Sequence, residues 1–196
     1  MAHRDDQIGV RASPQLSALI ARAEELGGGA APVDRWNPPD CGPIPMRIAA
    51  DGTWHYAGTP VARERLVRLF ASILRREADG AFVLVTPVEK MTIAVDDAPF
   101  VAVELVAEGE GRARTVTLRT NVGDVVRIGP DHPLRVAEEE GTGGFVPYVL
   151  VRGGLEARLT RAAALDLADL AEADASAPER LGVWSGGAFF PLGRAG

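Results

Sequence analysis

Residues 46–87 form the stretch MRIAADGTWHYAGTPVARERLVRLFASILRREADGAFVLVTP, from which we infer the fold. The stretch predicts a β-hairpin that turns at Asp51 and Gly52, then a helix with an apolar stripe, then a strand that ends at Thr86. Residues 149–192 predict the same order of elements in a shorter form. We therefore expect an α+β protein built on two internally duplicated hairpin-helix-strand units.

The two units also match in the placement of arginine and hydroxyl side chains. Arg63 begins the first helix and Thr86 follows 23 residues later, while Arg161 begins the second helix and Ser185 follows 24 residues later. A strand that returns antiparallel to its helix ends beside the unpaired N–H groups of the helix N-terminus. Such a combination suits an anion, and we expect both arginines to face one interdomain cleft. The alternative is that both arginines lie in solvent beside a helix start.

Composition and charge exclude several classes of protein. The chain has 196 residues, of which 46% are hydrophobic and 24% charged, as in ordinary folded proteins of one or two domains. Apolar runs fall short of the roughly 20 residues of a membrane span, and the first residues lack the apolar stretch of a secretion signal, so we expect a cytoplasmic protein. The net charge of −6 argues against long nucleic acid as a partner.

Known catalytic and cofactor motifs are missing from the sequence. It contains no phosphate-binding loop, dinucleotide fingerprint, HExxH or GxSxG. His3, His55 and His132 are scattered, and Cys41 is the single cysteine, which excludes an internal disulfide. We therefore expect no catalytic residues, no cofactor and no bound metal.

The expected N-terminal domain covers residues 1–86. Its parts are a helix over 13–26, capped by Ser13, a proline-rich strap over 30–45, and the hairpin-helix-strand unit over 46–86. The helix of that unit carries an apolar stripe from Leu66 to Leu74 and is expected to end at Asp79 and Gly80.

The expected C-terminal domain covers residues 87–196 and is rich in β-structure. A meander is predicted up to about Val136, then an acidic loop from Glu138 to Gly144, a further hairpin, a late helix over 161–171 capped by Thr160, and a closing hairpin. Several antiparallel strands with one late helix predict a curled sheet or an open barrel that the helix plugs.

Two polar runs follow predicted strands. TPVEKM places Glu89 and Lys90, the only lysine, just beyond Thr86, and RTNVGD contains Arg119, Thr120, Asn121 and Asp124. Threonine and asparagine can bind the edge of a sugar or base while Lys90 or Arg119 holds a phosphate. The alternative for RTNVGD is a turn held by Asn121 and Asp124 bonding to the local backbone.

Five segments, in order, resemble a bacterial family known as domain of unknown function 1285. They are CGPIPMRIAADGTW, TPVARERLVRLF, LVTPVEK with DDAPFVAVEL, LRTNVGDVVRIGPDHPLRV, and YVLVRGGLEARLTRAA with LGVWSGGAFFPLG. The resemblance covers about residues 36–193. The resemblance implies an internally duplicated α+β fold, a C-terminal domain superficially similar to pleckstrin-homology folds, and a nucleotide-like ligand at the domain interface. It also implies a role in signalling and brings no catalytic residues.

We therefore expect a regulatory or sensory module that binds a small anionic, nucleotide-like ligand where its domains meet. The expected ligand-facing residues are Arg63, Thr86, Lys90, Arg119, Thr120, Asn121, Arg158, Arg161 and Ser185. One alternative is an enzyme acting on a phosphorylated small molecule, with Glu89 or Asp124 as base and Lys90 or Arg63 stabilising charge. Another is a protein-interaction adaptor, in which the arginines only decorate the surface.

Overall fold

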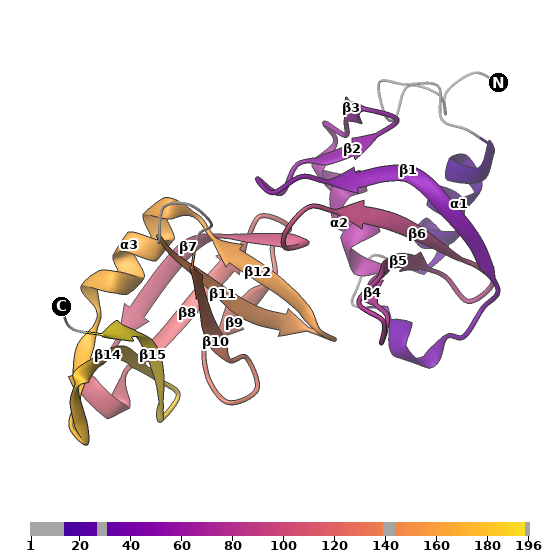
Figure 1. Ribbon diagram of the computed structural model, residues 1–196. Coiled ribbons are helices and arrows are strands. Elements are labelled where there is room, and N and C mark those ends of the chain that lie inside the picture. Colours follow the sequence, from indigo (N-terminus) through magenta and orange to yellow (C-terminus); the bar gives the residue numbers. More distant parts are fainter. Residues whose placement is uncertain (1–13, 27–30, 139–143, 195–196) are drawn as a thin grey trace. The chain divides into compact units, whose positions relative to one another are not determined.

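The chain divides between Asp97 and Ala98 into two units, each built on its own six-stranded sheet. The computed structural model describes residues 14–26, 31–138 and 144–194, and Figure 1 shows their helices and strands. The expected cap Ser13 and most of the acidic loop after Glu138 lie outside the described residues. Among the described helices, none is both long enough and apolar enough to cross a membrane.

The first unit combines two α-helices, a 3₁₀ turn and one mixed sheet. In chain order its elements are α1 (Pro14–Glu25), η2 (Val33–Arg35), β1 (Asp40–Ile48), β2 (Trp54–Tyr56), β3 (Thr59–Pro60), α2 (Glu64–Ser72), β4 (Leu74–Arg76), β5 (Phe82–Val85) and β6 (Lys90–Val95). The strand order is β3-β2-β1-β6-β5-β4, in which β1 and β6 are parallel and the other neighbours antiparallel.

The core of the first unit forms where its helices meet the sheet. The rings of Trp54 on β2 and Phe70 on α2 stack with centroids 5.9 Å apart, and both side chains are buried. α1 contacts α2 and buries Leu16 and Leu19, which lie on one face of this helix. Burial of large apolar side chains of this kind is the largest favourable contribution to folding.

The expected helix up to Asp79 is wrong in its second half. α2 ends at Ser72, and the residues that follow form β4, in which Leu74 pairs with Leu84 of β5. Asp79 and Gly80 make the turn of this β4–β5 hairpin, since the Asp79 carboxylate accepts the Ala81 N–H at 3.0 Å and Gly80 has φ +90°. An Asp-Gly pair is typical of a hairpin turn as well as of a helix end. Here the pairing of β4 with β5 shows that it forms a hairpin turn.

The strap and the domain boundary also differ from expectation. β1 begins at Asp40, so the second half of the strap is already a strand, with register shifts on either side of Pro43 that accommodate the prolines. β6 pairs with β1 and β5. Because this strand completes the first sheet, the first unit ends at Asp97, eleven residues beyond the expected end at residue 86.

The second unit holds a curled six-stranded sheet that forms a half-barrel, one helix and a small antiparallel sheet (Figure 1). Its elements are β7 (Phe100–Glu108), η3 (Gly111–Ala113), β8 (Thr115–Thr120), β9 (Val125–Arg127), β10 (Leu134–Glu138), β11 (Phe145–Arg152), β12 (Leu155–Leu159), α3 (Arg161–Asp169), β13 (Glu172–Asp174), β14 (Ala177–Ser185) and β15 (Ala188–Arg194). The curled sheet has the order β10-β11-β12-β7-β8-β9, and β13, β14 and β15 form the small sheet. β15 contacts β10, and β14 contacts β8 and η3.

The expected correspondence between residues 46–87 and 149–192 is wrong. The strands of the first stretch all belong to one sheet, whereas β11 and β12 belong to the curled sheet and β13, β14 and β15 to the small one. The repeat lies elsewhere, because β7 to β12 take the same strand order as β1 to β6. Each sheet joins two three-stranded meanders through a parallel pair made by its first and last strands, β1 with β6 and β7 with β12.

Candidate functional site

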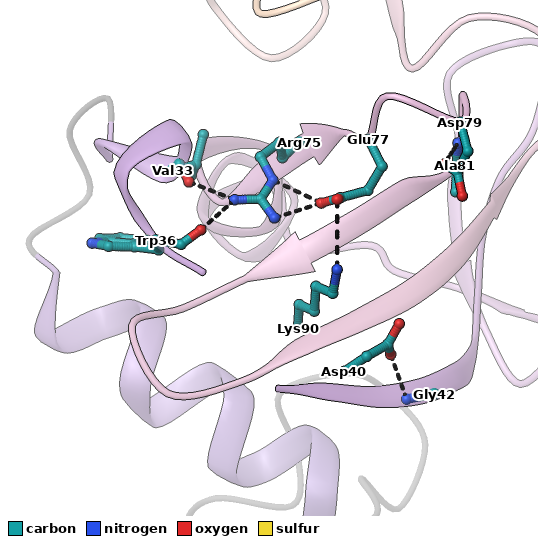
Figure 2. A network of polar contacts seen from close by, with 9 residues as sticks. All are labelled: Val33, Trp36, Asp40, Gly42, Arg75, Glu77, Asp79, Ala81 and Lys90. Carbon is teal, nitrogen blue, oxygen red and sulfur yellow. Dashed lines mark hydrogen bonds and ion pairs between the residues drawn. The ribbon is translucent and has the colours of Figure 1, made fainter. Parts of the chain in front are cut away.

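A network of polar contacts in the first unit surrounds the side chain of Arg75 on β4 (Figure 2). Its guanidinium donates to the Glu77 carboxylate at 2.5 and 2.8 Å and to the backbone carbonyls of Val33 and Trp36 at 2.8 and 2.6 Å. The Lys90 ammonium lies 3.5 Å from the other oxygen of Glu77. The only lysine is therefore engaged by a carboxylate of its own unit.

This network joins the segment before β1 to the end of the sheet. The planar guanidinium presents several N–H donors in fixed directions, and Arg75 uses them on two carbonyls and one carboxylate. Its side chain is 12% exposed, so these bonds are only weakly screened by water. Arg75 and Glu77 are absent from the expected site residues, because a helix was expected to continue up to Asp79 where the structure has β4.

Thr86, expected to face a ligand, closes the turn between β5 and β6. Its side chain is fully buried, accepts the N–H of Glu89 at 3.3 Å and donates to the carbonyl of Glu89 at the same distance. The Glu89 carboxylate forms an ion pair with Arg22 of α1. The turn is therefore held by its own hydroxyl and anchored to the first helix.

The RTNVGD run forms the turn between β8 and β9. The buried Thr120 hydroxyl accepts the Asp124 N–H at 3.0 Å, and the Asn121 side-chain oxygen accepts the Val101 N–H at 3.1 Å. Asp124 pairs with Arg152 at 2.5 Å. The bonds to backbone thus come from Thr120 and Asn121, while Asp124 balances a positive charge.

Arg119 and Ser185 occupy very different surroundings in the second unit. Arg119, about half exposed on β8, donates to Glu104 of β7 at 2.6 Å. Ser185 is fully buried at the end of β14, where its hydroxyl donates to the Ile128 carbonyl at 2.6 Å and accepts the Val116 N–H at 2.9 Å. Ser185 therefore fastens the small sheet to the curled sheet.

The three remaining arginines lie near helix starts. Arg63 is the exposed residue before α2, and its side chain does not cap that helix. Arg161 is exposed as the first residue of α3, whose N-cap Thr160 accepts the Ala163 N–H at 3.2 Å, which confirms the predicted cap. Arg158, half-buried on β12, lies just before the same cap.

The structure brings the expected residues together in small groups. Thr86 and Lys90 flank one turn, Arg119 and Thr120 end β8 just before Asn121 begins another turn, and Arg158 and Arg161 flank Thr160. Arg63 and Arg161 belong to different units, so their shared cleft stays a prediction. Within the described residues, no three histidine, cysteine or acidic side chains gather in a way that would hold a metal ion.

Shifted pKa values occur in other, exposed parts of the chain. The hydrogen bond with Asp96 raises the pKa of Arg47, and the backbone N–H of Thr53 lowers the pKa of Asp51 by binding its carboxylate. The Ser176 hydroxyl lowers the pKa of Asp174 in the same way. Each carboxylate accepts bonds within a turn, which favours its charged form.

Two α+β units that share one strand order, followed by a small antiparallel sheet, define the architectural class of this protein. The chain belongs to the DUF1285 family, as the sequence resemblance indicated: residues 31–98 match its N-terminal domain, described as a domain of unknown function, and residues 99–192 match its C-terminal domain, described as part of a protein of unknown function.

Two crystal structures of DUF1285 family proteins are similar to this chain. The protein from Silicibacter pomeroyi DSS-3 is 50% identical, with a TM-score of 0.84 over 90% of this chain and 95% of that one. The protein from Shewanella baltica OS155 is 26% identical, with a TM-score of 0.51 over 64% of this chain and 91% of that one. No curated protein matches the chain.

Proposed function

We propose that this protein is a regulatory or sensory module that binds a small anionic, nucleotide-like ligand. The observation that carries the proposal is the position of Arg161. It is exposed at the capped N-terminus of α3 and has no carboxylate partner among the described residues, whereas Arg114, Arg119 and Arg152 of the same unit are each paired with one. An arginine beside a helix N-terminus attracts anions.

Arg158 is the second proposed ligand contact. It precedes the Thr160 cap by two residues. Arg158 and Arg161 therefore lie on either side of the junction between β12 and α3. The hydroxyls of Thr86, Thr120 and Ser185 are already bonded to backbone groups, which supports a structural role for them. The signalling role and the pleckstrin-homology likeness implied by the family resemblance are part of the same proposal.

A thermal-shift screen against nucleotides and other phosphorylated metabolites tests this function. A ligand at 100 times its Kd adds about 2.7 kcal/mol to the free energy of unfolding. Arg161→Ala and Arg158→Ala should each weaken binding of a compound found in the screen by about 1.5–3 kcal/mol, the range for a charge-assisted hydrogen bond.

The matched control is Arg68→Ala, which removes an exposed arginine paired with Glu64 on the surface of α2. This variant should bind with unchanged affinity. Equal affinities for the wild-type protein, Arg158→Ala and Arg161→Ala would contradict the assignment of the site.

The other two candidate functions differ in their support. An enzyme acting on a phosphorylated small molecule needs a free base, yet Glu89 pairs with Arg22 and Asp124 with Arg152. A protein-interaction adaptor is favoured by one observation: three exposed valines, at positions 103, 106 and 125, lie on β7 and β9.

A further inference from the structure

The repeated strand order makes one unit an internal control for the other at the ends of the sheets. β3 (Thr59–Pro60) ends the first sheet, and β9 (Val125–Arg127) occupies the corresponding place in the second. At the opposite ends of the sheets, the Arg75 side chain of β4 binds the segment of Val33 and Trp36, and β15 contacts β10. β3 and β9 are therefore the edges to compare.

Proline closes the edge of the first sheet. The Val61 N–H donates to the Trp54 carbonyl at 2.8 Å, so the alternate residue, Pro60, directs its backbone away from β2. Proline has no N–H to offer a further strand, and it is one of the common devices that block an exposed edge.

The edge of the second sheet lacks this block. The Ile128 N–H donates to the Val116 carbonyl at 2.9 Å, and Val126 pairs with Leu118, so Val125 and Arg127 direct their backbone groups away from β8. Both residues carry an N–H as well as a carbonyl. No strand of the described chain pairs with β9 on that side.

The side chains along β9 define what would fit beside it. Val125 is 64% exposed, and Val106, on the same face two strands away, is 50% exposed. Arg127 is exposed and has no carboxylate partner among the described residues. Val126, between them, points into the core.

We propose that β9 is a docking edge for an extended peptide segment of a partner protein, which adds to the sheet as an antiparallel seventh strand. The segment carries an acidic residue opposite Arg127 and an apolar residue opposite Val125, with one small residue between them. Hydrogen bonds to the N–H and carbonyl groups of Val125 and Arg127 supply affinity, and the two side-chain pairs supply selectivity. The proposal does not depend on the anion site.

The test is selection of displayed random hexapeptides on the immobilised full-length protein. Peptides with an acidic residue two positions before an apolar one should be enriched. The Val125→Pro variant copies the edge of the first unit and keeps the bonds to β8, and it should bind an enriched peptide at least tenfold more weakly. Arg127→Glu should reverse the preference from acidic to basic peptides, and Val106→Ala, away from the edge, should change affinity less than twofold.

A modified peptide separates a docking effect from a folding defect of the variants. Methylation of the peptide nitrogen opposite Val125 should abolish binding to the wild-type protein, while methylation of a neighbouring nitrogen that points away should not. Absence of enrichment, equal binding by Val125→Pro, or indifference to methylation would overturn the proposal. So would a wild-type dimer, measured by sedimentation, that Val125→Pro converts to monomer, since a second copy would then occupy the edge.

Discussion

Thr86, Thr120 and Ser185 each bury a hydroxyl side chain. Thr86 and Ser185 were expected to bind a ligand because each ends a strand 23 or 24 residues after an arginine at a helix start, and Thr120 because it lies in the polar RTNVGD run. In the structure each one bonds to backbone groups of its own unit. A hydroxyl at the end of a strand has the same sequence pattern whether it binds a ligand or the local backbone. The pattern therefore identifies a candidate residue but does not determine its hydrogen-bond partner.

Ser185→Ala should lower the free energy of unfolding by about 1–3 kcal/mol. The substitution leaves the Val116 N–H and the Ile128 carbonyl buried without their hydroxyl partner. Chemical denaturation measures the loss, and Ser176→Ala, on an exposed turn, is the control, with a change of less than about 0.5 kcal/mol. Equal stability of the two variants would show that Ser185 does not fasten the small sheet.

Glu77→Gln should cost more than the loss of an exposed ion pair. It removes the carboxylate that Arg75 and Lys90 share, and both cations lie mostly out of solvent. We expect a loss of about 1.5–3 kcal/mol in the free energy of unfolding, the range for hydrogen bonds to charged groups.

The control for this prediction is Asp96→Asn, which breaks the exposed pair with Arg47 and should cost less than about 1 kcal/mol. The comparison uses urea unfolding of the intact protein. A smaller effect for Glu77→Gln than for Asp96→Asn would mean that the network adds nothing beyond a surface contact.

At the scale of elements, periodicity predicted most strands and the start of each helix. α1, α3 and the Thr160 cap follow the predicted positions within a few residues, because helical periodicity and the Thr160 cap are local signals. α2 was predicted too long, since Ile73 and Leu74 continue a helical stripe and also suit a buried strand. Only pairing with β5, a contact between distant residues, decides between the two.

Gly182→Ala should destabilise the small sheet because β14 and β15 approach closely at this residue. An added Cβ would lie 2.5 Å from both the Phe189 ring and the Phe190 carbonyl. We expect a loss of about 1–3 kcal/mol, as for an overpacked core, measured by thermal unfolding.

Gly193→Ala, on the paired strand β15, is the matched control, since its Cβ would meet no atom within 4 Å. It should keep the melting temperature of the wild-type protein. If both alanine variants have the same melting temperature, β14 and β15 adjust more freely to an added methyl group than their packing indicates.

At the scale of the whole molecule, the sequence analysis identified the α+β class and a duplication but paired the wrong segments. The similar patterns near Arg63 and Arg161 came from two helices that occupy different places relative to their sheets: α2 lies between β3 and β4, and α3 follows β12. The true repeat is one of strand order, which depends on long-range pairing and leaves little trace in local pattern. For the same reason the domain boundary was predicted one strand too early, before β6 instead of after it.

The observed boundary predicts how fragments of the chain behave. A fragment of residues 1–97 contains all six strands of the first sheet and should unfold cooperatively with temperature. A fragment of residues 1–86 lacks β6, which lies between β1 and β5, so its sheet splits into two parts. Circular dichroism should show no cooperative transition for the shorter fragment, and a sharp transition there would contradict the central role of β6.

The parallel pairing of the first and last strands also sets an order of events during synthesis. β1 leaves the ribosome early, yet its neighbour β6 is made after every other strand of that sheet. The hairpins β1–β2 and β4–β5 can form on the nascent chain, but they remain separate until residue 95 is free of the exit tunnel. The second sheet repeats this delay with β7 and β12. We therefore expect the two sheets to be completed one after the other during synthesis, each when the last strand of that sheet has been made.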